Sequence, residues 1–176
     1  AVAPYHVDAL LPEDTPDYIQ TAYQSLHYHA ITTVYLRYAQ AVRLPAPLTG
    51  FADGTAQWVL HRGTLGLPDN EVAVVISVSD YTEAWKDKDL AEKIHADIKR
   101  VCPDLDKPEA VRIITEKRAT TAATVDFVQP DFSWLHHRRI YPAGDYLHPR
   151  YPATLEAAVQ SGFAAAEKLM LDLRFE

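Results

Sequence analysis

The 176-residue sequence has little of several residue types, and each shortage excludes a class of protein. A single cysteine, Cys102, excludes an internal disulfide framework and a zinc site built from several cysteines. None of the six glycines forms the Gly-x-Gly-x-x-Gly turn of a dinucleotide-binding fold. No apolar run approaches the roughly 20 residues of a membrane-spanning helix, and no signal peptide opens the chain.

Basic residues are also in short supply, with 17 Lys and Arg against 24 Asp and Glu, which gives a net charge of -7 at pH 7. This balance argues against a broad nucleic-acid-binding surface. The hydrophobic share of 48% and the charged share of 23% are typical of folded globular proteins and argue against intrinsic disorder. We therefore expect a folded cytoplasmic protein that does not bind nucleic acid.

Alternating or continuous apolar residues predict four strands, at 29–38, 56–61, 72–79 and 111–120. Segment 72–79 is apolar on both faces and is expected in the middle of the sheet. Short turns between the first three strands indicate an antiparallel meander. A short helix is expected from about Pro16, and a longer one from Asp89, whose pairing with Glu92 resembles a capping box. The fold class is thus α+β, an antiparallel sheet backed by helices.

The first and last segments carry the remaining expectations. Residues 1–4 suit the end of a strand that begins upstream, as in a fragment or a processed chain. Residues 140–146 are expected to form a strand that closes on Gly144 and Asp145, followed by a loop and a helix from about Leu155. The free amides of a helix start favour an anionic ligand, and the Asp145 carboxylate can accept a hydrogen bond from a sugar or ribityl hydroxyl. Periodicity assigns one face of this helix to the core: Leu155, Ala158, Val159, Gly162, Phe163, Ala166, Leu169, Met170 and Leu173.

Segments 143–145 and 152–162 together resemble the C-terminal FAD-binding signature of flavin amine oxidases and phytoene-type desaturases, including the squalene-associated branch of hydroxysqualene dehydroxylases. Glu116–Thr120 resembles the segment that this branch carries before its signature. The resemblance implies that residues 1–8 are either the end of a strand that returns the chain to an FAD domain or a linker. It also implies that 9–135 form a substrate-domain-like α+β region and that 136–176 form a strand-loop-helix in contact with FAD. The implied cofactor-binding residues are Gly144, Asp145, Tyr146, Pro152, Ala153, Thr154, Leu155 and Glu156.

The same resemblance implies a function and partners. The chain would be the C-terminal part of an FAD-dependent oxidoreductase that transfers hydride between flavin and an isoprenoid, such as a squalene derivative or a carotenoid precursor. Its partners would be a missing N-terminal nucleotide-binding domain, which holds the adenosine half of FAD, and the apolar substrate, with peripheral contact to a membrane. An apolar helix face left uncovered by that domain leads us to expect a homo-oligomer. No catalytic acid or base is assigned.

Two other functions stay open. An amine oxidase would need an aromatic cage beside the flavin, for which Tyr141, Tyr146 and Tyr151 are available. A non-catalytic α+β domain that pairs with a partner chain would explain the absent nucleotide fold.

Other chemically active side chains give weaker signals. His27, His29, His136 and His137 lack the spacing of a metal site, although the basic run 136–139 could meet an anion. Lys117 and Arg118 read as an exposed edge pair, to which the resemblance adds a site role. Cys102 is expected to be unreactive. Tryptophans are expected in the core or lining an apolar pocket, namely Trp58, Trp85 and Trp134.

Overall fold

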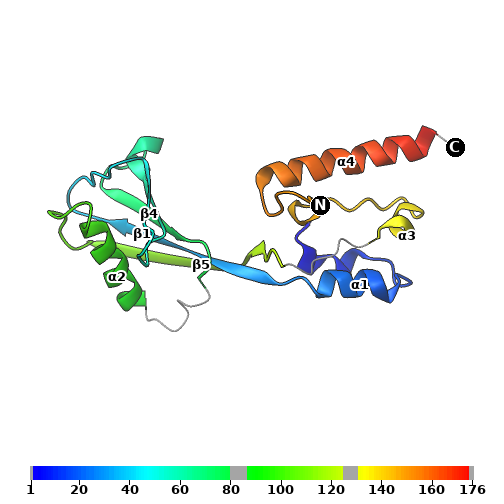
Figure 1. Cartoon of the computed structure of the whole chain (residues 1–176), viewed down its shortest axis with the longest axis horizontal. Coiled ribbons are helices and arrows are strands. Elements are labelled where there is room, and N and C mark those ends of the chain that lie inside the picture. Colours follow the sequence, from blue (N-terminus) through cyan, green and yellow to red (C-terminus); the bar gives the residue numbers. More distant parts are fainter. Residues whose placement is uncertain (1, 80–86, 125–130, 175–176) are drawn as a thin grey trace. The chain divides into compact units, whose positions relative to one another are not determined.

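The computed structural model describes residues 2–79, 87–124 and 131–174, which divide into two compact units. Unit 1 comprises Ala1–Tyr28 and Thr121–Glu176, and unit 2 comprises His29–Thr120 (Figure 1). These units follow packing and assign no function, so the division at residues 8 and 135 into a substrate region and a cofactor region stays a prediction.

Unit 2 is built on a five-stranded sheet with the order β2-β3-β4-β1-β5. The strands are β1 (Tyr28–Arg37), β2 (Leu48–Gly50), β3 (Trp58–His61), β4 (Glu71–Ile76) and β5 (Ala110–Thr121). The register of β1 with β4, of β3 with β4 and of β2 with β3 is antiparallel. The predicted α+β fold with an antiparallel sheet is therefore confirmed, as is the central place of β4.

Two details of the sheet differ from the predictions. The first predicted strand does not lie beside the second but beside β4, with Val34 opposite Val74. Strand β4 is apolar on both faces, so it is most fully buried when β1 and β3 flank it. The second difference is β2, which forms where a turn was expected, because Leu48 and Gly50 pair with Leu60 and Trp58 at the sheet edge.

One face of this sheet is covered by helix α2 (Asp87–Lys99), which follows the predicted apolar stripe (Figure 1). Leu90, Ile94 and Ile98 pack with the buried side chains of β1 and β4. The helix begins two residues before the expected cap, which places Asp89 in the first turn, where a negative charge is favourable. Asp97 accepts hydrogen bonds from the amides of Thr55 and Ala56, at 2.6 and 2.9 Å, and so ties the loop before β3 to the helix.

Unit 1 contains α1 (Asp17–Gln24), α3 (Ser133–His136) and α4 (Leu155–Arg174), with short 3-10 helices at Pro4–His6, Asp8–Leu10 and Asp145–Leu147. The helix after Pro16 is confirmed. Buried side chains of α1, of α3 and its preceding residue, of the last 3-10 helix, and of the residue between the first two 3-10 helices form one cluster: Val7, Ile19, Tyr23, Phe132, Leu135 and Tyr146. None of the helices among the described residues is both long enough and apolar enough to cross a membrane.

Both strands expected in unit 1 are wrong for the described residues. Pro4 opens a 3-10 helix instead of ending a strand, while Ala1 lies outside the described part. Residues 140–144 are not assigned to a strand, and Asp145 begins another 3-10 helix. An apolar run becomes a strand only when another strand supplies its hydrogen bonds, and the described part of unit 1 supplies none.

Candidate cofactor site

The Gly144–Asp145 motif is fastened by its backbone to the start of α4. The amide of Gly144 donates to Ser161 Oγ at 2.9 Å, and the carbonyl of Asp145 accepts from the amide of Ala153 at 3.1 Å. Six of the eight predicted cofactor residues lie in two short segments, 144–146 and 152–154, which the bond between Asp145 and Ala153 joins, and the other two begin α4. The structure thus brings the predicted residues together in unit 1.

The first turn of α4 offers free backbone donors. Thr154 caps the helix, since its Oγ1 accepts from the Ala157 amide at 3.1 Å and donates to the Tyr151 carbonyl at 3.0 Å. The amides of Leu155 and Glu156 have no acceptor among the described residues, as expected for the first turn of a helix. These two N–H groups, together with the helix dipole, favour an anionic ligand atom.

Beside this helix start, Asp145 and Ala153 are held in unusual states. The Asp145 side chain is half-buried, yet its carboxylate has no hydrogen bond or ion pair within the part of the chain that is described. Ala153 has a φ of 61°, a left-handed conformation that non-glycine residues adopt rarely. Such strain collects at ligand sites, and a partly desolvated carboxylate gains from a hydroxyl donor. Both features are those expected where a ligand completes the structure.

Gly144 and Tyr146 pack directly against each other. A Cβ on Gly144 would lie 2.3 Å from Cε1 of the Tyr146 ring, so this ring needs a glycine here. Tyr146 is buried, edge-on to Tyr23 with ring centroids 6.0 Å apart, and its hydroxyl donates to that of Tyr23 at 3.4 Å. Burial raises the pKa of both phenols, so both stay neutral. The cofactor contact expected for Tyr146 stays a prediction, and the structure places this side chain in the core of unit 1.

A cavity of about 280 Å³ in unit 1 lies beside Tyr146. Tyr146 and Pro152 are the two predicted cofactor residues that line it, together with Leu26 and the segments 121–124 and 147–149. Its wall is mostly apolar or neutral, which suits a flat ring better than a charged group.

The loop before α4 is organised by His148 and Gln160, for which the sequence predicted no role. The amides of Arg150 and Tyr151 lie 3.2 and 3.3 Å from His148 Nδ1 and can only donate to it. The proton of His148 therefore sits on Nε2, which donates to Gln160 Oε1 at 3.0 Å. Gln160 in turn donates to Glu156 at 2.6 Å, one helical turn earlier. That four-residue spacing was the one signal in the sequence for this network.

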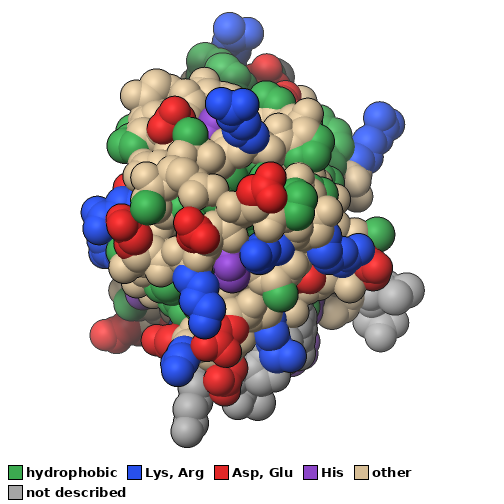
Figure 2. All heavy atoms as spheres, turned by 90° about the vertical axis from the view of Figure 1, so that its left-hand side faces the viewer, with side chains coloured by type: hydrophobic (Ala, Val, Ile, Leu, Met, Phe, Trp, Pro, Cys, Tyr) green, Lys and Arg blue, Asp and Glu red, His purple; other side chains and the backbone are tan. Residues whose placement is uncertain are grey.

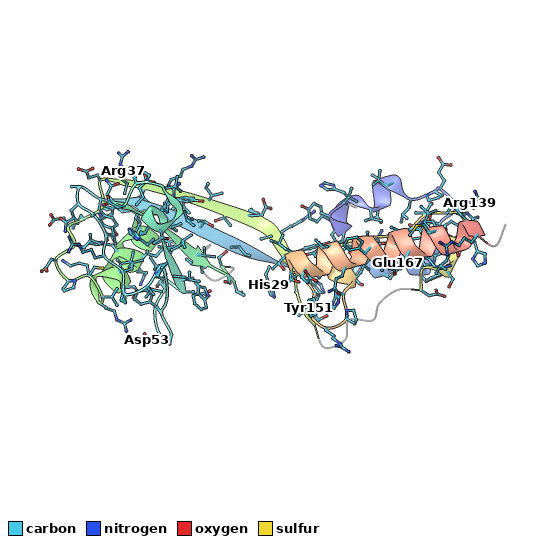
Figure 3. All side chains as sticks on the ribbon, turned by 90° about the horizontal axis from the view of Figure 1, so that it is seen from above. His29, Arg37, Asp53, Arg139, Tyr151 and Glu167 are labelled. Carbon is cyan, nitrogen blue, oxygen red and sulfur yellow. The ribbon has the colours of Figure 1, made fainter. Side chains whose placement is uncertain are left out.

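The three tyrosines considered for an aromatic cage have separate partners. Tyr141 stacks on His136 and donates to Asp172 at 2.9 Å. Tyr151, which precedes α4 (Figure 3), stacks on His148 with ring centroids 3.8 Å apart, and Tyr146 lies in the core. Among the described residues these rings do not share a cage.

The remaining candidates are placed as follows. Within residues 2–79, 87–124 and 131–174, no three His, Cys, Asp or Glu side chains are grouped for a metal ion. In the basic run, Arg138 pairs with Asp14 at 2.6 Å and lies over the Trp134 ring, while His136 and Arg139 line a hollow of about 240 Å³. Cys102 donates to the Arg43 carbonyl, and burial raises the pKa of its thiol, as an unreactive cysteine requires.

Trp58, Lys117 and Arg118 are exposed on unit 2, whereas Trp85 lies outside the described residues. The face in Figure 2 shows basic and acidic side chains interspersed, without a broad basic area.

Comparison with known protein families matches residues 1–170 to the family described as flavin containing amine oxidoreductase. The chain belongs to this family. The predicted resemblance is therefore confirmed, and the family is one of oxidoreductases that carry a flavin.

Two curated relatives are hydroxysqualene dehydroxylases. The one from Zymomonas mobilis is 29% identical over 178 residues, which cover 95% of this chain and 37% of the relative. The one from Rhodopseudomonas palustris is 31% identical over 147 residues, which cover 81% of this chain and 33% of the relative. The chain thus spans about a third of the length of these relatives.

A solved structure shares the fold of this chain. The crystal structure of a candidate protoporphyrinogen oxidase from Exiguobacterium sp. 255-15 superposes with a TM-score of 0.58 at 17% identity, over 95% of this chain and 40% of that one.

Proposed function

We propose that the chain is the C-terminal part of an FAD-dependent oxidoreductase that acts on an apolar isoprenoid, either a squalene derivative or a carotenoid precursor. The observation that carries the cofactor half is that two amides at the start of α4 and the nearby Asp145 carboxylate all lack a hydrogen-bond partner among the described residues. The names of the curated relatives support the substrate half.

The described residues fit part of a flavin dinucleotide. The Leu155 and Glu156 amides would face the edge of the ring system where reduction builds negative charge, and the Asp145 carboxylate would accept from a ribityl hydroxyl. The strained Ala153 holds the backbone between them. Bound flavin supplies the hydride-transfer chemistry, while the protein binds, orients and tunes the charge around it. The adenosine half would be held by a nucleotide-binding domain outside this chain, because no Gly-x-Gly-x-x-Gly is present in it.

The open face of the unit 2 sheet supports an apolar substrate. Helix α2 covers the opposite face, whereas this face presents Tyr35, Val75 and Trp58, the last of which is 47% exposed. Apolar surface of this kind on a sheet is typical of a binding surface. The family match also favours an enzyme over a non-catalytic domain.

A longer protein that carries this chain provides the test. We expect it to bind FAD, with binding weakened at least tenfold by Asp145→Asn and unchanged by Asp17→Asn, which alters an exposed carboxylate of the same unit. Under anaerobic conditions an isoprenoid that is oxidised, such as a carotenoid precursor undergoing desaturation, should bleach the oxidised flavin. A hydroxylated squalene derivative that is reduced should instead reoxidise the reduced flavin, and a primary amine should do neither. Bleaching by amines alone would contradict the isoprenoid substrate and favour an amine. Normal FAD binding by Asp145→Asn would show that Asp145 does not contribute to the site.

A further inference from the structure

Three arginines gather on the open face of the unit 2 sheet. Arg37 ends β1 (Figure 3), Arg62 follows β3, and Arg112 lies on β5. Together with Tyr35 and Glu71 they line a hollow of about 500 Å³. The sheet itself enforces this meeting, because Arg37 lies opposite Glu71 and His61 lies opposite Val72 in the strand register.

The hollow carries an excess of positive charge. Arg62 forms an ion pair with Glu71 and lies over the Tyr35 ring, with its Cζ 5.3 Å from the centroid. The side chains of Arg37 and Arg112 form no ion pair or hydrogen bond with any described residue. Three guanidinium groups thus meet one carboxylate, in a chain whose net charge is -7. Like charges repel unless an anion lies between them, and planar guanidinium groups suit phosphate oxygens in particular.

Apolar side chains continue from the hollow along the same face. Ile114 lines the hollow itself and is exposed. On the neighbouring strands Val75 lies opposite Trp58. Residues two apart along a strand share a face, so Tyr35 lies on the same face of β1 as Arg37. A ligand that matches both parts has an anionic head and an apolar chain.

We propose that this hollow binds the phosphate or diphosphate group of a lipid-like ester, and that the hydrocarbon tail of this ester lies along Tyr35, Val75 and Trp58. The inference rests on the proposed function only in taking the hydrocarbon part of the ligand to be an isoprenoid. The anion site follows from the three arginines alone.

The test uses the purified 176-residue chain without FAD, titrated at low salt with farnesyl diphosphate, inorganic pyrophosphate and farnesol. Calorimetry gives the affinities. We expect farnesyl diphosphate to bind more tightly than either pyrophosphate or farnesol. Arg37→Gln and Arg112→Gln should each weaken its binding about tenfold or more and leave farnesol unaffected. Arg43→Gln, an equal change of charge on an exposed residue of the same unit, should bind like the wild type.

Three results would overturn the inference: both hollow variants binding farnesyl diphosphate like Arg43→Gln, farnesol binding as tightly as its diphosphate, or pyrophosphate binding as tightly as the ester. Arg37 and Arg112 are exposed, so their replacement leaves the core intact, and circular dichroism verifies that each variant is folded. Because no flavin is present, failure here leaves the FAD experiment standing, and failure of FAD binding leaves this one standing.

Discussion

Replacing Gly144 by alanine should destabilise unit 1 even when no cofactor is present. The new Cβ would lie 2.3 Å from Tyr146 Cε1 and 2.7 Å from Cδ1, about 1.2 Å inside an ordinary carbon–carbon contact of roughly 3.5 Å. The backbone itself accepts alanine, because a φ of 175° and a ψ of 159° are extended. The whole cost therefore comes from moving a buried ring, and overpacking of this kind costs about 1–3 kcal/mol.

Urea unfolding of the flavin-free chain measures that cost, and Gly162→Ala is its matched control. Gly162 lies within α4, and no atom of the described residues lies within 4 Å of the position its Cβ would take, so alanine there should stabilise unit 1 by about 0.5–1 kcal/mol. In a Tyr146→Leu background most of the Gly144→Ala cost should disappear, because the ring is gone. A Gly144→Ala chain as stable as the wild type would refute the packing argument and leave cofactor approach as the reason for this glycine.

Two further predictions concern the helix start and the pH response. Thr154→Ala should destabilise unit 1 by about 1 kcal/mol through loss of the cap, and Thr154→Ser should restore most of it in urea unfolding; equal losses in both variants would contradict the capping role. In unit 2, burial and the nearby Lys99 and Lys107 lower the pKa of His95. The unfolded chain therefore takes up this proton first, so the contribution of His95 to stability is complete above about pH 6.5 and is lost as the pH falls toward its lowered pKa. Between about pH 7.5 and 5.5 the wild type should lose more stability than His95→Gln, and an equal loss in both would count against this assignment.

Local pattern predicted the elements of unit 2 better than their arrangement. The alternation in β1 and β5 and the stripe of α2 depend on neighbours in sequence, so they could be found there. The place of β1 beside β4 depends on which partner buries both faces of β4, a long-range choice that alternation does not encode. Residues 140–144 failed as a strand for the same reason, because their apolar character indicates burial and does not supply a partner.

The candidate site shows the same limit. Motif resemblance located Gly144, Asp145 and Thr154. In the structure Gly144 is hydrogen-bonded to Ser161, Asp145 to Ala153 and Thr154 to Ala157, so all three are tied to the start of α4 or to the residues before it. The core position of Tyr146 could not be read from the motif, because Tyr23, its hydrogen-bond partner, is 123 residues away along the chain.

Helix α4 shows most clearly what the sequence could not predict, since the face that was predicted to lie in the core is turned away from the rest of unit 1. The residues that lie against the unit are small or polar, namely Ala157, Ser161, Ala165 and Asp172, whereas Leu155 is 89% and Phe163 67% exposed. Periodicity finds an apolar face but does not identify what covers it.

Phe163 therefore contributes little to the fold of the described chain. Phe163→Ser should change the free energy of unfolding by less than about 0.5 kcal/mol, because the ring is largely exposed to water in the folded chain as well as in the unfolded one. The same change should reduce self-association in sedimentation equilibrium if copies of the chain cover this face in each other. Glu167→Gln, a surface change on the same helix (Figure 3), is the control for altered solubility. A loss of several kcal/mol in Phe163→Ser would mean that the ring is packed within the chain, and the outward orientation of α4 would be wrong.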